Sequence, residues 1–302
     1  MLTGKIIVQG ELGPKNIGLF TYNDWLYNLT RITPENMLAF SPVWSPNGKV
    51  IAFVYSDLEE SDFRIAIMDV DSKKTGVILN RGIGNLLIQE GTSLAWSPDG
   101  NSLMFDLVGS DNCHYLFVYN VEKRKYQQAS INFCQGKTIY PIINKLDISW
   151  SPGDAPLIGV SYQGDWGSRG DIYLADQALT KVRLITNGSY PIWRIGEQDF
   201  SYVCWKSPSS IPAICLYSPD RGPLSTIVES YGYDKYTWSP DRRYILFVDV
   251  GHEIGNPSFL SAVDVNAKEK YNLLRLKKSP LTLFDLLIPF PWDGGEATWS
   301  AK

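Results

Sequence analysis

The sequence predicts an all-β fold, a six-bladed β-propeller with four antiparallel strands in each blade. Three observations support this prediction. A short phrase that begins with tryptophan recurs along the 302 residues, the segments between its copies have the composition of short strands, and no long amphipathic helical stretch is present. A repeat of roughly 40–50 residues is typical of propellers and helical arrays, and the strand-like content selects the propeller.

The repeated phrase places a tight turn directly after the tryptophan, most clearly in Trp96-Ser97-Pro98-Asp99-Gly100. Proline fixes φ, aspartate favours turns and glycine accepts positive φ, so these residues should join two strands. The other copies are Trp44-Ser45-Pro46-Asn47-Gly48, Trp150-Ser151-Pro152-Gly153-Asp154, Trp193-Arg194-Ile195-Gly196-Glu197, Trp238-Ser239-Pro240-Asp241-Arg242 and Trp299-Ser300-Ala301-Lys302. We predict a structural role for the phrase, with each indole packed between neighbouring blades.

Each interval between copies contains the remaining strands of one blade. After the turn at Trp44, three runs of strand length follow at Val50–Tyr55, Phe63–Val70 and Thr75–Leu79, rich in β-branched and aromatic residues. The other intervals repeat this pattern. The predicted blades are residues 39–80, 92–133, 145–187, 190–230 and 234–277 for blades 2 to 6.

The two ends of the chain are predicted to form blade 1 together. The chain opens in a strand-like run, Lys5–Gln9, with no phrase before it, and closes with a phrase that no blade follows. A ring closed in this way leaves only short, protected strand edges. Blade 1 should therefore combine residues 296–302 with residues 1–33, closed by the C-terminal strand, after an apolar insertion at residues 278–295.

The phrases resemble the repeat of the TolB-type β-propellers, a WD-repeat-like family built around Trp-Ser-Pro-Asp-Gly. The resemblance covers nearly the whole chain and implies the propeller fold. It leaves function open, because such propellers serve as binding platforms, as gates on peptidases and as parts of larger surface proteins.

Composition narrows the class of partner. A formal net charge of −4 argues against nucleic acid, which needs a basic face, and no apolar run is long enough for a membrane span. No targeting segment precedes the first strand, so we expect either that a precursor segment was removed or that the chain is part of a longer protein.

The four cysteines bear on the compartment. The strand pattern places Cys113 almost opposite Cys134 at the open end of one hairpin, and Cys204 and Cys215 on neighbouring strands. Two plausible disulfides indicate an oxidising compartment, periplasm or cell surface. The alternative, four buried thiols in a cytoplasmic protein, stays open.

No catalytic motif stands out, and His114 and His252 are the only histidines. The leading hypothesis is therefore a non-catalytic module that binds a protein, peptide or cell-surface partner with the loops on one face of the propeller. The aromatic and charged residues expected on these loops are Asp165, Trp166, Arg169, His252, Glu253 and Trp292. The apolar stretch Leu281–Trp292 either packs against its own propeller or is a second candidate surface, for contact with another chain or domain.

Two alternatives remain. One is a metal-dependent hydrolase, similar in outline to six-bladed lactonases, with calcium held at the channel mouth by Asp147, Asp234 and Glu296, which lie three or four residues before a blade tryptophan. The other is a gating propeller domain of a larger peptidase.

Overall fold

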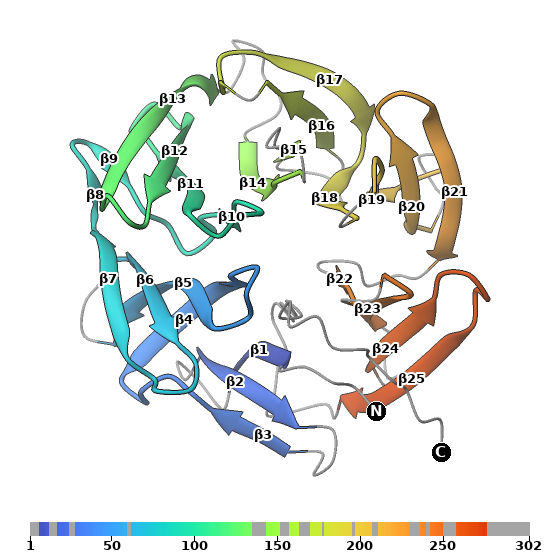
Figure 1. The fold of residues 1–302 in the computed structure, drawn as a ribbon, viewed down its shortest axis with the longest axis horizontal. Helices are drawn as coiled ribbons and strands as arrows, with labels where there is room; N and C mark the ends of the chain where they lie inside the picture. The colour runs from blue at the N-terminus through green and yellow to red at the C-terminus, as the bar shows by residue number, and fades with distance from the viewer. Residues whose placement is uncertain are drawn as a thin grey trace. The chain divides into compact units, whose positions relative to one another are not determined.

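The computed structural model describes residues 6–11, 17–23, 28–58, 62–134, 143–151, 157–162, 170–176, 178–194, 197–206, 211–229, 236–239, 242–249 and 258–276. These residues form strands and no helix, in six sheets that we name A to F in chain order (Figure 1). None of the described segments forms a helix of the length and apolarity that a bilayer crossing needs.

Sheets A to C come from the first half of the chain. Sheet A contains β1 (Ile6–Glu11), β2 (Ile17–Asn23) and β3 (Asn28–Arg31). Sheet B contains β4 (Met37–Trp44), β5 (Val50–Asp57), β6 (Arg64–Asp69) and β7 (Thr75–Asn80). Sheet C contains β8 (Gly82–Ile83), β9 (Leu86–Leu87), β10 (Leu94–Trp96), β11 (Ser102–Val108), β12 (His114–Asn120) and β13 (Lys125–Phe133).

Sheets D to F each have four strands in sequential order. Sheet D contains β14 (Ile143–Ser149), β15 (Leu157–Tyr162), β16 (Gly170–Ala175) and β17 (Val182–Asn187). Sheet E contains β18 (Ser189–Trp193), β19 (Phe200–Cys204), β20 (Ala213–Ser218) and β21 (Gly222–Glu229). Sheet F contains β22 (Tyr236–Trp238), β23 (Tyr244–Asp249), β24 (Ser258–Asp264) and β25 (Lys270–Leu276).

The strands group into two compact units, which we describe separately. The first unit holds β1–β5 and β22–β25, and the second holds β8–β20; β6, β7 and β21 cross the boundary. In the first unit, Trp44 and Phe53 pack with Leu19 of sheet A in one apolar cluster. In the second unit, Leu116 of sheet C packs with Leu146 of sheet D, and Ile172 of sheet D packs with Trp193 of sheet E. Each of these tryptophans therefore lies in a cluster shared by two sheets.

The turn after the tryptophan is closed by a buried serine. The Ser97 N–H donates to the Ser102 carbonyl at 2.8 Å, and the Ser102 N–H donates back to Ser97 Oγ at 2.9 Å. The same two bonds join Ser45 to Val50 and Ser239 to Tyr244. Because these serines are at most 4% exposed, their hydroxyls complete hydrogen bonds that water cannot reach.

The third residue of the turn adds a second bond to the serine. The Ser97 hydroxyl donates to Asp99 Oδ1 at 2.5 Å, and the Ser45 hydroxyl donates to Asn47 Oδ1 at 2.8 Å. The glycine that follows has φ of 71° at Gly100 and 65° at Gly48, the left-handed region that glycine adopts without strain. The turn that the sequence predicts is therefore held by its serine, its Asp or Asn, and its glycine.

We expect Ser97→Ala to lower the free energy of unfolding by about 1–3 kcal/mol, because it leaves the partly buried Ser102 N–H without its side-chain acceptor. The variant should also raise the Asp99 pKa, since the Ser97 hydroxyl is the main cause that holds the pKa of this carboxyl below its usual range. A depressed folded-state pKa stabilises the protein above the unfolded pKa, and this contribution is lost as the pH falls through the folded value. Urea unfolding and an NMR titration of Asp99 measure the two effects; unchanged stability together with an unchanged pKa would contradict this role for the serine.

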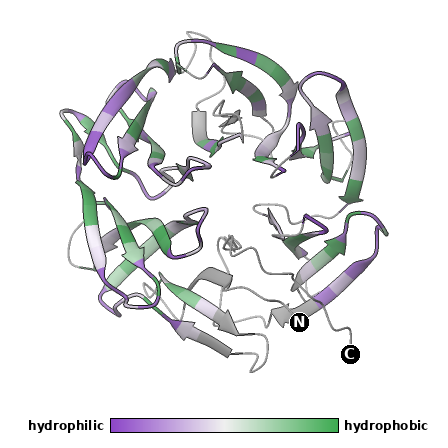
Figure 2. Cartoon of the chain, in the orientation of Figure 1, coloured by the Kyte–Doolittle hydropathy of each residue, from purple (hydrophilic) through white to green (hydrophobic). Residues whose placement is uncertain are grey.

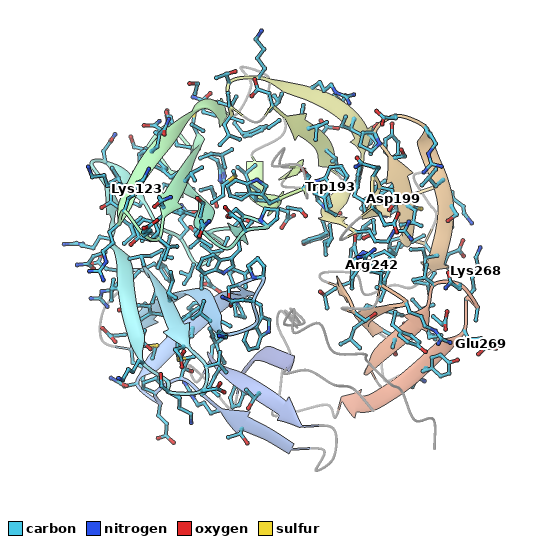
Figure 3. The ribbon with its side chains drawn as sticks, viewed as in Figure 1. Lys123, Trp193, Asp199, Arg242, Lys268 and Glu269 are labelled. Atoms are coloured by element: carbon cyan, nitrogen blue, oxygen red, sulfur yellow. A yellow bond between two sulfur atoms is a disulfide. The ribbon has the colours of Figure 1, made fainter. Side chains whose placement is uncertain are left out.

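The copy at Trp193 keeps the turn with different side chains. The Arg194 N–H donates to the Asp199 carbonyl at 3.1 Å, the same backbone bond that Ser97 makes to Ser102. Arg194 also binds the Asp199 carboxylate with two bonds, Nε to Oδ1 at 2.8 Å and Nη2 to Oδ2 at 2.6 Å. An ion pair across the turn therefore stands where the other copies have a serine, and Figure 3 labels Trp193 and Asp199 beside this turn.

Hydrogen bonds also join neighbouring sheets of the second unit. Ser93 Oγ accepts the N–H of Ile148 at 3.2 Å, and Ser149 Oγ accepts the N–H of Trp193 at 3.0 Å. Toward the outer strands, the Leu179 carbonyl accepts the N–H groups of Ser130 and Ile131 at 3.1 and 3.2 Å. Sheets C and D are thus joined at two places, and sheets D and E by the bond from Trp193 to Ser149.

The predicted closure of blade 1 lies outside the described residues. Sheet A supplies three described strands, and the strand expected from residues 296–300 is not among them. The same holds for the insertion at residues 278–295. The six-bladed count and its closing strand therefore remain predictions.

Candidate functional site

The residues that the sequence indicated for partner binding lie outside the described parts of the chain. They are Asp165, Trp166, Arg169, His252, Glu253 and Trp292, together with the contact stretch Leu281–Trp292. Of the proposed calcium ligands, Asp147 lies on β14, paired with Gly159, whereas Asp234 and Glu296 are not described. Within the described ranges, no three His, Cys, Asp or Glu side chains come together as a metal site, so calcium remains a prediction.

The described loops of sheet C contain a short hairpin that the sequence pattern did not predict. Between β7 and β10, the strands β8 and β9 form a hairpin, with Gly82 paired to Leu87 and Ile83 paired to Leu86. Leu87 also pairs with Val108, so the hairpin extends sheet C beside β11. We name residues 81–91 and the neighbouring loop 109–113 the loop platform.

The hairpin follows from a two-residue turn. Gly84 has φ of 62° and is followed by Asn85, a pair that suits the tight turns of β-hairpins. The Ile88 N–H donates to the Arg81 carbonyl at 3.1 Å and closes the base of the hairpin. Gly-Asn between short apolar runs was the sequence signal that would have found it.

The loop platform is held in place by buried side chains of its own hairpin and by contact between its two segments. Leu86 and Ile88 are buried, and a Cβ placed on Gly109 would lie 3.3 Å from Leu86 Cδ2, so the two segments of the platform are in close contact. Within the second segment, the Gly109 N–H donates to the Cys113 carbonyl at 2.9 Å. The disulfide between Cys113 and Cys134 then joins this segment to the end of β13.

The platform presents apolar and charged side chains to solvent. Leu87 is 56% exposed although its neighbours Leu86 and Ile88 are buried. The Arg81 side chain is 69% exposed, and its Nε lies 2.8 Å from Asp62 Oδ2. An apolar side chain fixed on a short hairpin beside an exposed ion pair has the mixed character of protein-binding surfaces.

A buried polar pair joins β11 and β12 next to the platform segment 109–113. Asp106 Oδ2 lies 2.7 Å from His114 Nδ1, and the two side chains are 2% and 7% exposed. Asp106 Oδ1 accepts the Ser93 N–H at 2.6 Å, and Ser93 Oγ in turn accepts the Ile148 N–H. One carboxylate therefore joins β11 to β12 and to the segment that follows the platform, and Ser93 carries the connection to sheet D.

The sequence showed both members of this pair without showing that they meet. Asp106 is the single charged residue within the apolar run from Leu103 to Val108, and His114 begins the next strand. The register Val108↔His114 brings them together across two strands. A charged residue inside an apolar strand was the signal, because such a group needs a buried partner.

All four cysteines form disulfides, Cys113–Cys134 and Cys204–Cys215, with Cα atoms 4.1 and 6.0 Å apart. The first lies next to the pair His114↔Phe133, at the start of β12 and the end of β13. The second lies between β19 and β20, where Cys204 pairs with Ala213 and Cys215 with Tyr202. These are the two cysteine pairings that the strand pattern of the sequence predicted.

No family model matches the chain, and no curated protein sequence is similar to it. Solved structures are similar. TolB from Acinetobacter baumannii matches with a TM-score of 0.70 and 17% identity, over 93% of this chain and 65% of the TolB chain. A putative TolB from Agrobacterium tumefaciens matches with a TM-score of 0.59 and 14% identity, over 91% and 90%.

A third similar structure is the β-propeller domain of the Trilobed protease from Pyrococcus furiosus, with a TM-score of 0.54 and 17% identity, over 89% of this chain and 85% of that one. At these identities the similarity shows the fold and not the activity. The predicted propeller fold is confirmed: the chain has a TolB-like β-propeller fold.

Proposed function

We propose that the chain is a non-catalytic β-propeller module that binds a protein or peptide partner with the loop platform of sheet C. The observation that supports this proposal most directly is Leu87, an apolar side chain that is 56% exposed although Leu86 and Ile88 on either side of it are buried. Propellers hold their loops on a rigid scaffold, and such loops are the usual place for binding residues.

The surroundings of Leu87 favour binding over chemistry. The polar groups Asp106, His114 and Ser93 of sheet C already bond to each other or to the backbone, so their hydrogen bonds serve the structure of the sheet. Arg81, at the base of the same hairpin, offers an exposed guanidinium, and arginine is enriched at binding hot spots.

We also propose that the protein works outside the cytoplasm. Its two disulfides support this location, because disulfides persist in oxidising compartments and are rare in the cytosol. The six-bladed arrangement closed by the C-terminal strand belongs to the same proposal, since it would make the scaffold rigid.

Leu87→Asp should weaken partner binding by about tenfold to a hundredfold, the loss expected for a central interface residue, and should leave the melting temperature within a few degrees of wild type. The measurement is quantitative co-purification from the extracytoplasmic fraction of the source cells, with the tagged wild type and variant compared by mass spectrometry.

The matched control is Leu224→Asp, which places the same charge on β21, where Leu224 is 37% exposed. It should leave the captured proteins unchanged. Equal capture by the Leu87 variant and wild type would contradict the role of the platform.

A further inference from the structure

The two disulfides differ in their access to solvent. Cys134 is exposed and follows the last residue of β13, so the Cys113–Cys134 bond lies at the open end of the hairpin. Each bond has one buried cysteine, Cys113 at 6% and Cys204 at 7% exposure, but the partner of Cys204 is the half-buried Cys215, on strands that are paired from Phe200↔Tyr217 to Cys204↔Ala213. Thiol–disulfide exchange needs direct approach of a thiolate to one sulfur, so access separates the two bonds.

The accessible bond also holds the loop platform in place. Cys113 ends the segment 109–113, which is closed by the Gly109 N–H bond to the Cys113 carbonyl and by the Cys113 N–H bond to Asp111 Oδ1 at 3.1 Å. Through Gly109 this segment contacts Leu86, one of the residues that support the hairpin. Apart from the disulfide, the end of β13 is joined to β12 by the backbone pair His114↔Phe133.

The second disulfide, Cys204–Cys215, does not attach a described loop to the sheet. Both of its cysteines are in strands, and Cys215 Sγ lies 3.7 Å from Thr226 Oγ1 of β21. If this bond opened, the hydrogen-bonded pairs of β19 and β20 would still hold the two strands in register. Strand pairs lie next to both bonds, so the difference is that Cys113 ends the platform segment 109–113, whereas Cys204 and Cys215 end no described loop.

We propose that Cys113–Cys134 is a thiol-responsive staple of the loop platform, opened by a dithiol reductant while Cys204–Cys215 stays closed. A thiolate of the reductant attacks Cys134 Sγ, the S–S bond breaks, and Cys113 leaves as a thiolate that takes up a proton. The second thiolate of the reductant then displaces Cys134, so two electrons reduce the protein bond and the reductant becomes a disulfide. The inference uses the platform of the proposed function but needs no partner.

The test is a time course of the whole chain with dithiothreitol under native conditions. At each time the free thiols are alkylated and located by peptide mass spectrometry, and amide hydrogen exchange is measured on the same sample. We expect Cys113 and Cys134 to be labelled at least about tenfold faster than Cys204 and Cys215, because exchange rates follow access. Exchange should then rise at residues 81–91 and 109–113 and stay constant across β19 and β20.

Two results would overturn the staple. One is labelling of Cys204 and Cys215 first or at the same rate, and the other is unchanged exchange of the platform after Cys113–Cys134 has opened. The Cys113→Ser/Cys134→Ser variant should show the raised exchange without reductant, with Cys204→Ser/Cys215→Ser as the matched control. If the first variant does not fold, the time course on the wild-type chain still decides, and neither readout depends on Leu87 or on partner capture.

Discussion

Asp106→Ala is expected to lower the free energy of unfolding by about 3–5 kcal/mol, because it leaves two hydrogen-bonding groups of sheet C without their acceptor, at roughly 1–3 kcal/mol each. The carboxylate is the partner of two groups, His114 Nδ1 at 2.7 Å and the Ser93 N–H at 2.6 Å. Because His114 is buried, water cannot replace the lost acceptor without opening the sheet. Urea unfolding, with the midpoint and slope fitted for each variant, measures the loss.

Two further variants distinguish the effect of losing the Asp106 carboxylate from the effect of removing an aspartate at any position. Asp106→Asn keeps an oxygen that can accept from the Ser93 N–H, so it should lose less than the alanine variant, and it provides the measurement if alanine prevents folding. Asp220→Ala removes an exposed aspartate on the turn between β20 and β21 and should change stability by less than about 0.5 kcal/mol. A loss below about 1 kcal/mol in Asp106→Ala would show that the buried pair does not hold sheet C together.

The second large effect is expected at the turn after Trp193. Asp199→Ala should lower the free energy of unfolding by about 2–3 kcal/mol, because it breaks a two-bond ion pair whose aspartate side chain is 5% exposed. The expected loss is smaller than at Asp106, since Arg194 is 23% exposed and regains part of its hydration. Urea unfolding is again the measurement.

A double variant tests whether the ion pair replaces the serine of the other turns. Arg194→Ser/Asp199→Val recreates the Ser45–Val50 pair, in which the serine Oγ accepts the N–H of the residue five positions later. We expect the double variant to have a higher free energy of unfolding than Asp199→Ala. That result would mean that the effects of substituting positions 194 and 199 are strongly coupled. Stability equal to or below that of Asp199→Ala would mean that the two kinds of turn are not equivalent.

Local sequence determined much of what could be predicted about the fold. The turn residues Ser97, Asp99 and Gly100 act within a few positions of each other, so their pattern indicates the turn directly. The strands after each turn were found for the same reason, because β-branched and aromatic runs carry their own preference. Even the divergent copy at Trp193 forms the same backbone bond, although its ion pair could not be foreseen from one sequence.

The candidate site depended on contacts that the local pattern does not show. Asp106 and His114 meet only once the strand register is fixed, and Leu87 is exposed only because the hairpin buries Leu86 and Ile88 beneath it. The sequence predicted binding residues from the composition of long loops instead, and those loops lie outside the described residues. Register and burial are properties of the folded chain, which explains why the platform had to come from the structure.

The most direct test of the central claim is site-specific photo-crosslinking from position 87. A photoreactive amino acid replaces Leu87 in one variant and Leu224 in the other, and both are irradiated in intact source cells. The account predicts a discrete crosslinked protein from position 87 that is absent from position 224. The same crosslinks from both positions, or none from position 87 while the variant remains folded, would contradict a partner-binding role for the loop platform.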